Sequence, residues 1–92
     1  MTLVQLEYYI GVCECKSFSH AARRLNVTQP ALSFAVKQLE REYGSVFIVR
    51  QPSGRNTVTE SGKVFYEFAK STLAEIAAME RQAKAACSLL NV

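Results

Sequence analysis

The sequence predicts a mainly α-helical chain in which three helices and a two-stranded β-hairpin precede one long helix. Three observations lead to this fold class. Up to Gly44, apolar residues recur at helical spacing and are interrupted twice, at residues 16–19 and 26–28. Residues 46–59 are rich in β-branched and turn-forming types. The segment that follows has no proline and no glycine after Gly62, which favours a helix.

A capping residue indicates where each of the first two helices begins. Thr2 is expected to cap the first helix, and Gln5, three residues on, completes a capping box. Four apolar residues at helical spacing are predicted to form its inward face: Leu3, Leu6, Ile10 and Cys13. Ser19 is the predicted cap of a short second helix over residues 20–25, in which two alanines permit close packing.

The third helix has both a start and a stop signal. Thr28 is the predicted cap, Pro30 is tolerated in the first turn because its missing N–H would be unpaired there, and Gly44 ends the helix. Four apolar residues are predicted to face inward: Leu32, Val36, Leu39 and Tyr43. The opposite or flanking side then carries polar residues: Gln29, Ser33, Lys37 and Arg41.

Residues 46–49 and 57–59 are β-prone, and a turn-rich stretch separates them. This pattern predicts a two-stranded hairpin. Its tip is basic on both sides, because Arg50 and Arg55 flank the turn.

The long helix, from about residue 60, carries an apolar seam. Residues spaced by 4 and 3 in alternation form the face of a coiled coil. Eight residues have this spacing: Phe65, Ala69, Thr72, Ile76, Met79, Ala83, Ala86 and Leu90. Phe68, Leu73 and Leu89 widen the apolar face, so one edge is expected to pack on its own domain and the other on a partner. The sequence therefore predicts a dimerisation helix, and the alternative is a helix packed wholly within its own domain.

Size and charge limit the organisation and the partners. The 92 residues, 49% of them hydrophobic, fit one small domain over residues 1–59 and the helix over residues 60–92. The net charge of +3 is uneven: residues 16–63 carry eight basic and three acidic residues, which gives +5, whereas the charges after them balance. A basic segment beside a neutral one is typical of a nucleic-acid reader joined to a protein-contact element, and a solvated surface is the alternative.

Catalysis, metal binding and membrane insertion are not expected. His20 is the only histidine and aspartate is absent, so no catalytic triad or paired-carboxylate site can be built. Cys13, Cys15 and Cys87 match no common zinc or disulfide spacing, so we expect no cofactor. No apolar run approaches the roughly 20 residues of a membrane helix, and the N-terminus does not resemble a signal peptide. A cytoplasmic, nucleoid-associated location is the expectation.

Two short helices joined by a three-residue turn indicate a helix-turn-helix over about residues 18–37, and the hairpin over about 45–59 supplies a wing. In such a winged helix-turn-helix the second helix of the pair enters the major groove of double-stranded DNA. Thr28 and Gln29 are predicted to anchor a phosphate at the helix start, and Gln29, Ser33 and Lys37 to reach base edges. The predicted DNA-binding residues lie on this helix and on the wing: Thr28, Gln29, Pro30, Ser33, Phe34, Lys37, Arg50 and Arg55.

Residues in the first two thirds of the chain also follow, in order, the N-terminal pattern of a known family. They are Phe18, Ser19, His20, Ala21, Ala22, Leu25, Asn26, Val27, Thr28, Gln29, Pro30, Ala31, Leu32, Ser33, Val36, Leu39, Glu40, Gly44, Arg50, Val58, Thr59, Glu60, Ser61 and Gly62. From about Leu3 to Phe65 the chain resembles the LysR-type transcriptional regulators. The resemblance implies a bacterial transcription factor that binds a dyad-symmetric promoter site, with linker helices that pair antiparallel into a homodimer. Full-length members also have a C-terminal ligand-sensing domain that assembles tetramers.

The chain departs from this family pattern at several points. After Ser33, where many members carry a basic or polar residue, it has Phe34, which either contacts a thymine methyl or lowers the affinity for DNA. The usual Leu-Phe before the arginine is replaced by Phe47 and Ile48, a change expected to preserve the strand. The wing is about one residue longer than in many relatives, close to Arg55.

No effector domain is expected in residues 1–92, which predicts either a fragment of a longer regulator or a short protein that works alone. The competing interpretation is a protein-interaction module that pairs with full-length relatives through the long helix and binds DNA weakly.

Overall fold

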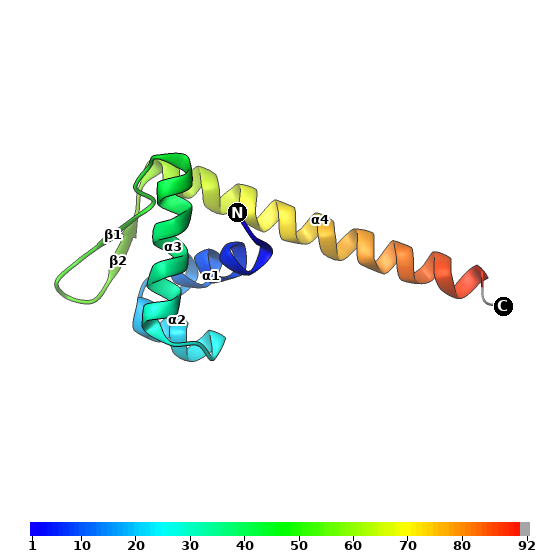
Figure 1. The fold of residues 1–92 in the computed structure, drawn as a ribbon, viewed down its shortest axis with the longest axis horizontal. Helices are drawn as coiled ribbons and strands as arrows, with labels where there is room; N and C mark the ends of the chain where they lie inside the picture. The colour runs from blue at the N-terminus through cyan, green and yellow to red at the C-terminus, as the bar shows by residue number, and fades with distance from the viewer. Residues whose placement is uncertain (91–92) are drawn as a thin grey trace.

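The computed structural model describes the backbone of residues 1–90 and the side chains of residues 1–88. Three helices and a small hairpin form a compact head, and a long helix extends away from it, so that the molecule measures 58 × 26 × 18 Å (Figure 1). The elements follow one another as α1 (Leu3–Cys15), α2 (Phe18–Leu25), α3 (Gln29–Tyr43), β1 (Ile48–Arg50), β2 (Asn56–Val58) and α4 (Glu60–Leu90). The predicted fold class is confirmed.

The helix ends show which capping predictions hold. Thr2 and Gln5 form the predicted capping box, since the Gln5 N–H donates to Thr2 Oγ1 at 3.1 Å and the Thr2 N–H donates to Gln5 Oε1 at 2.9 Å. The predicted start of α2 was wrong: Ser17, not Ser19, caps it and accepts from the His20 N–H at 3.2 Å. The physical reason is that Lys16 adopts a left-handed conformation that ends α1, and the extended Ser17 then starts α2 at once.

α1 is the central helix of the head and packs against α2, α3 and α4. Its predicted inward face was partly wrong, because Leu6, Tyr9 and Val12 are buried whereas Leu3 is 48% exposed. The leucine, valine, isoleucine and tyrosine residues of α1 are distributed around its whole circumference. Their spacing alone therefore does not show which face packs against the three neighbouring helices. On α3, the predicted stripe is confirmed except at its end, where Tyr43 is 47% exposed.

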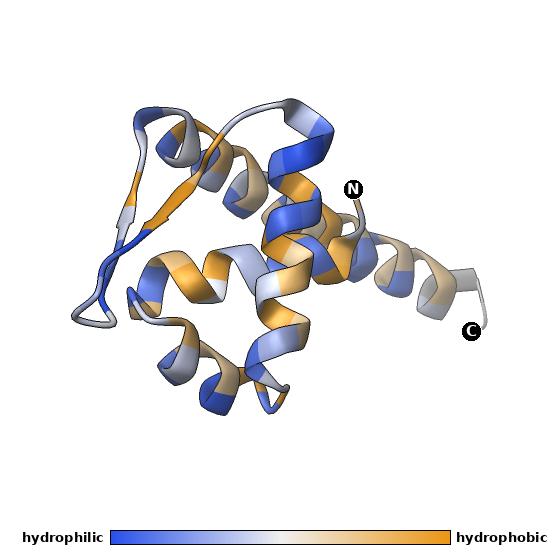
Figure 2. Cartoon of the chain, turned by 60° about the vertical axis from the view of Figure 1, so that its left-hand side comes forward, coloured by the Kyte–Doolittle hydropathy of each residue, from blue (hydrophilic) through white to orange (hydrophobic). Residues whose placement is uncertain are grey.

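The wing is an antiparallel pair in which Ile48 faces Val58 and Arg50 faces Asn56. Figure 2 shows that the hairpin is hydrophobic where it leaves the head and hydrophilic toward its tip. The backbone N–H of Asn56 donates to the Lys16 carbonyl at 2.9 Å, which attaches the wing to the end of α1.

An aromatic cluster joins the head to the first turns of α4. The Phe47 and Phe65 rings stack with centroids 4.8 Å apart, and Tyr9 packs edge-on against both. The buried Tyr9 hydroxyl donates to the Gly62 carbonyl at 2.6 Å. A side chain at Gly62 would not fit, since its Cβ would lie 2.3 Å from the carbonyl oxygen of Phe47. The start of α4 is therefore fixed to the head.

The predicted seam of α4 divides into two parts. Phe65 is 9% exposed and Ala69 is fully buried, so the head of the same chain covers both. This corrects their assignment to a dimer surface, because side chains this deeply buried in the head leave almost no surface for a partner to contact. The seam residues Thr72 and Ile76 and the flanking Leu73 are half-buried, and three further seam residues are exposed: Met79, Ala83 and Ala86. The side chain of Leu90 lies outside the described residues.

Candidate nucleic-acid interface

The turn between α2 and α3 sets the angle at which α3 is presented. Asn26 takes a left-handed conformation, with φ of 57°, and its N–H bonds the last carbonyls of α2. The Val27 N–H donates to the Ala22 carbonyl at 3.0 Å. Thr28 then caps α3 as predicted, and its Oγ1 accepts from the Ala31 N–H at 3.3 Å. The tight turn leaves the start of α3 open to solvent.

The outward face of α3 brings together the residues predicted to contact DNA. Five of them are exposed and one, Ser33, is half-buried: Thr28, Gln29, Pro30, Ser33, Phe34 and Lys37. They lie opposite or beside the residues that α3 buries, which are Leu32, Ala35, Val36 and Leu39. The Gln29 side chain is held from α2, because its Oε1 accepts from the Ser19 hydroxyl at 3.2 Å.

Arg50 ties the wing to this face. Its guanidinium lies 3.6 Å from the centroid of the Phe18 ring and donates to the hydroxyl of Ser33. Cation–π contacts and hydrogen bonds of this kind hold an arginine in one orientation. Arg50, a predicted wing residue, is thus linked to Ser33, a predicted base-reading residue. The sequence motifs that contain these two residues do not reveal this contact.

Arg55 lies on the far side of the wing tip and is exposed. Gly54, with φ of +90°, forms the turn before it, and the Gln51 N–H closes the turn by donating to the Arg55 carbonyl at 3.0 Å. Among the described residues, no carboxylate lies within 4.0 Å of the cationic groups of Lys37, Arg50 or Arg55. Their positive charge is therefore available to an anionic partner.

Glu40 is a site residue whose role the sequence did not indicate. Its carboxylate accepts from the backbone N–H groups of Phe47 at 2.7 Å and Ile48 at 3.1 Å. These bonds fix the start of β1 against α3. Glu40 and Glu42 balance Lys37 and Arg41 on this helix, so charge alone gave no signal for this role.

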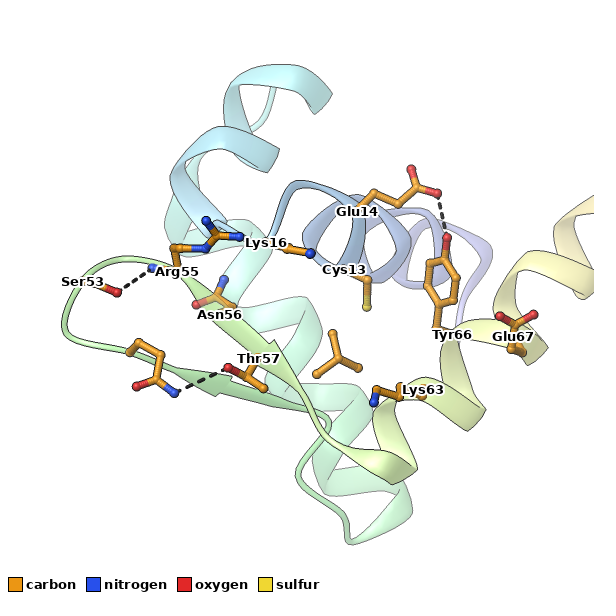
Figure 3. A pocket seen from close by; sticks show the side chains of 12 residues that line it. Cys13, Glu14, Lys16, Ser53, Arg55, Asn56, Thr57, Lys63, Tyr66 and Glu67 are labelled. Carbon is orange, nitrogen blue, oxygen red and sulfur yellow. Dashed lines mark hydrogen bonds between the residues drawn. The ribbon is translucent and has the colours of Figure 1, made fainter.

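A crevice of about 860 Å³ separates the wing from α4, and Figure 3 shows side chains from three elements around it. On its rim, Glu14 accepts from the Tyr66 hydroxyl at 2.9 Å and from Lys70 and Arg24 at 3.3 Å each. The hydrogen bond from Tyr66 and the two cations lower the pKa of Glu14, and the same bond to the carboxylate raises the pKa of Tyr66. Nearby, burial raises the pKa of Cys13 to about 11. Glu14 thus connects α1, α2 and α4.

No helix in the described part of the chain is long and apolar enough to cross a membrane. Within the same residues, no group of three histidine, cysteine or glutamate side chains is placed to hold a metal ion.

Comparison with known proteins identifies the family. The model of the bacterial regulatory helix-turn-helix proteins of the lysR family matches residues 3–63. The chain belongs to the lysR family. It is 35% identical over 86 residues to the HTH-type transcriptional regulator TfdT of Cupriavidus pinatubonensis, covering 94% of this chain and 37% of TfdT. It is 41% identical over 76 residues to the regulator AlsR of Bacillus subtilis, covering 83% of this chain and 25% of AlsR. The chain therefore spans less than half the length of these relatives.

Two solved structures resemble this lysR-family chain over nearly its whole length. The BenM_DBD/catB site 1 DNA complex matches with a TM-score of 0.90 and 33% identity, covering 96% of this chain and 98% of that one. The CbnR_DBD–DNA complex matches with a TM-score of 0.90 and 31% identity, covering 95% and 99%. The head and the long helix are thus arranged as in lysR-family DNA-binding domains.

Proposed function

We propose that this lysR-family chain binds double-stranded DNA sequence-specifically, with α3 in the major groove and the wing on the neighbouring phosphates or minor groove. The exposed outward face of α3, with the Arg50-tethered wing beside it, is the observation that carries the proposal. The DNA complexes of the BenM and CbnR domains support it, because this chain shares their fold. The chain acts as a transcriptional regulator rather than an enzyme, at the nucleoid in the cytoplasm.

The residues of the face divide into two roles. Thr28 and the open N-terminus of α3 bind a backbone phosphate, since helix starts favour anions. Gln29, Ser33 and Lys37 reach base edges, where glutamine suits adenine and lysine suits guanine. Pro30 and Phe34 supply apolar contact between them, and the two wing arginines, Arg50 and Arg55, bind flanking phosphates or enter the minor groove.

The chain acts as a dimer on a dyad-symmetric site. α4 extends far beyond the head, and its outer part has an exposed seam with no other element of the described chain against it (Figure 1). The proposed dimer surface comprises the described seam residues beyond Ala69, together with the flanking Phe68 and Leu73: Phe68, Thr72, Leu73, Ile76, Met79, Ala83 and Ala86. Pairing places two recognition helices roughly 34 Å apart, one turn of DNA.

DNA binding is tested by fluorescence anisotropy on a duplex selected from a random library, against a scrambled duplex, from low to high salt. Affinity for the selected duplex should exceed that for the scrambled one and fall steeply with salt, because bound counterions are released. Lys37→Ala should weaken binding by about tenfold, the equivalent of one base contact. Lys84→Ala, which removes the same charge from the outside of distal α4, should leave the affinity unchanged. Equal binding to both duplexes at every salt concentration would favour the protein-interaction alternative.

Dimerisation is tested by sedimentation equilibrium. Ile76→Glu should raise the dimer dissociation constant by at least about tenfold, because pairing would bury an unpaired charge. The matched control is Ala77→Glu, which places the same charge one residue away on the exposed side of α4 and should have little effect. The dimer proposal fails if the unmodified chain is monomeric at high micromolar concentration, or if both variants disrupt pairing equally.

A further inference from the structure

Phe34 stands out among the exposed hydrophobic side chains. It is 59% exposed on the outward face of α3. Two other exposed aromatics, Tyr43 and Phe68, are 47% and 44% exposed, but their rings pack against Phe65 at 5.4 and 5.6 Å. Those two rings complete the edge of the core, whereas Phe34 points away from it. The fold alone does not account for a phenyl ring at this position.

The position of Phe34 on the helix places it at the centre of the proposed DNA contact. Pro30 lies four residues before it and Lys37 three residues after it, so the three side chains are neighbours on one face. Ser33, beside it, is bonded to Arg50 of the wing. A base pair covered by this face of α3 would therefore meet Phe34 beside Pro30 and Lys37.

The chemistry of the major groove limits what a phenyl ring can recognise there. Guanine, adenine and cytosine present only hydrogen-bond donors and acceptors along this edge, whereas thymine also presents a methyl group. A phenyl ring over a polar edge removes water from that edge and returns no hydrogen bond, which costs binding energy. Over a thymine methyl the ring buries apolar surface instead, which is favourable.

We infer that Phe34 reads the methyl group of a thymine in each half-site, so that the chain requires a T·A pair at the position Phe34 covers. The inference rests on the proposed function, since it names a base that the same interface selects. It makes Phe34 a determinant of specificity, in place of the polar side chain that would read a hydrogen-bonding edge.

The test removes only that methyl group. Selection from a random duplex library with the full chain first defines the bound sequence. Each thymine of the selected site is then replaced in turn by deoxyuridine, which pairs identically but lacks the methyl. At one thymine per half-site, this replacement should weaken binding by about fourfold, the fold-change that corresponds to burying one CH₂ group. Replacement at the other thymines should have less effect.

Two variants connect the effect to the side chain. Phe34→Ala should bind the thymine and deoxyuridine duplexes equally, and selection with it should no longer enrich thymine at that position. Phe34→Leu keeps an apolar side chain and should retain part of the discrimination. Folding is checked by circular dichroism, and an exposed helical position tolerates alanine well. Lys37→Ala is the control, because it should weaken binding to both duplexes while leaving their ratio unchanged.

The possible failures are distinguishable. If selection enriches no sequence, the proposed function fails and the inference fails with it. If a site is enriched but deoxyuridine at every thymine leaves the affinity unchanged, the chain is a specific DNA-binding protein and Phe34 does not read a methyl. Equal loss on deoxyuridine DNA in the unmodified chain and in Phe34→Ala would also overturn the inference.

Discussion

The head and the outer part of α4 obtain their stability in different ways. In the head, Leu6, Tyr9 and Leu39 are at most 1% exposed, and they meet side chains from several elements. In α4, every residue from 79 to 88 is exposed. An isolated helix is only marginally stable in water, so the outer part of α4 relies on its helix-favouring composition and, in the proposed dimer, on the partner helix. Side-chain burial therefore distinguishes a region that packs within one chain from a region whose exposed side chains are available for the proposed pairing.

The first turns of α4 belong to the head rather than to the outer helix. Phe65 and Ala69 are buried against it, and the carbonyl of Gly62 is bonded to Tyr9. The boundary between the two regions therefore lies inside one continuous helix, beyond Ala69.

The largest expected effect separates the two regions directly. Leu39→Ala should lower the free energy of unfolding by about 3 kcal/mol, because it leaves a cavity in the fully buried core. Met79→Ala removes an exposed side chain of α4 and should change the free energy of unfolding by less than about 0.5 kcal/mol in dilute protein. Urea denaturation followed by circular dichroism measures both. Similar losses in the two variants would show that the head and the outer part of α4 do not differ in this way.

The next effect tests the junction. Alanine usually stabilises a helix relative to glycine, but Gly62→Ala should destabilise the chain by about 2 kcal/mol because its Cβ would clash with a backbone carbonyl. The control is Gly11→Ala, whose Cβ would lie 2.8 Å from Cδ1 of Leu25, a side chain that can move. Gly11→Ala should therefore lower the free energy of unfolding by less than Gly62→Ala in the same urea titration. A Gly62→Ala chain as stable as the unmodified one would show that α4 is not fixed at its start.

Local signals were sufficient to predict the elements and most of their ends. Thr2, Thr28 and Gly44 act through their own backbone neighbours, so their roles can be predicted from short motifs. The start of α2 was predicted wrongly because Ser17 and Ser19 are the same residue type and are equally suited to cap a helix. Only the left-handed conformation of Lys16, which precedes Ser17, decides between them.

Contacts between distant segments could not be predicted in this way. The seam spacing of α4 is the same before and after Ala69, so periodicity cannot reveal that the head covers only the first part. The tie from Arg50 to Ser33 joins residues 17 positions apart, and the contact of Glu14 with Tyr66 joins residues 52 apart. Such pairs depend on how the elements pack, which a single sequence does not specify. The roles assigned to the DNA-contact residues remain predictions.

The smallest expected effect concerns the polar contacts that brace α4 against α1. Because the pKa of Glu14 is lowered in the folded chain, its carboxylate stabilises the fold above the ordinary glutamate pKa of about 4.3. That contribution is lost as the pH falls through the lowered pKa of the folded chain, where Glu14 takes up a proton. The side chain is partly exposed, so we expect less than about 1 kcal/mol in total.

The measurement compares the unfolding free energy of the unmodified chain with that of Glu14→Gln between pH 7 and pH 3. The unmodified chain should be the more stable at pH 7, and the difference should shrink toward zero below about pH 4. Glu67→Gln is the control, since it removes a carboxylate from the same crevice that has no ion-pair partner among the described residues. If the difference in unfolding free energy between the unmodified chain and Glu14→Gln did not change with pH, the carboxylate charge of Glu14 would not be what braces α4 against the head.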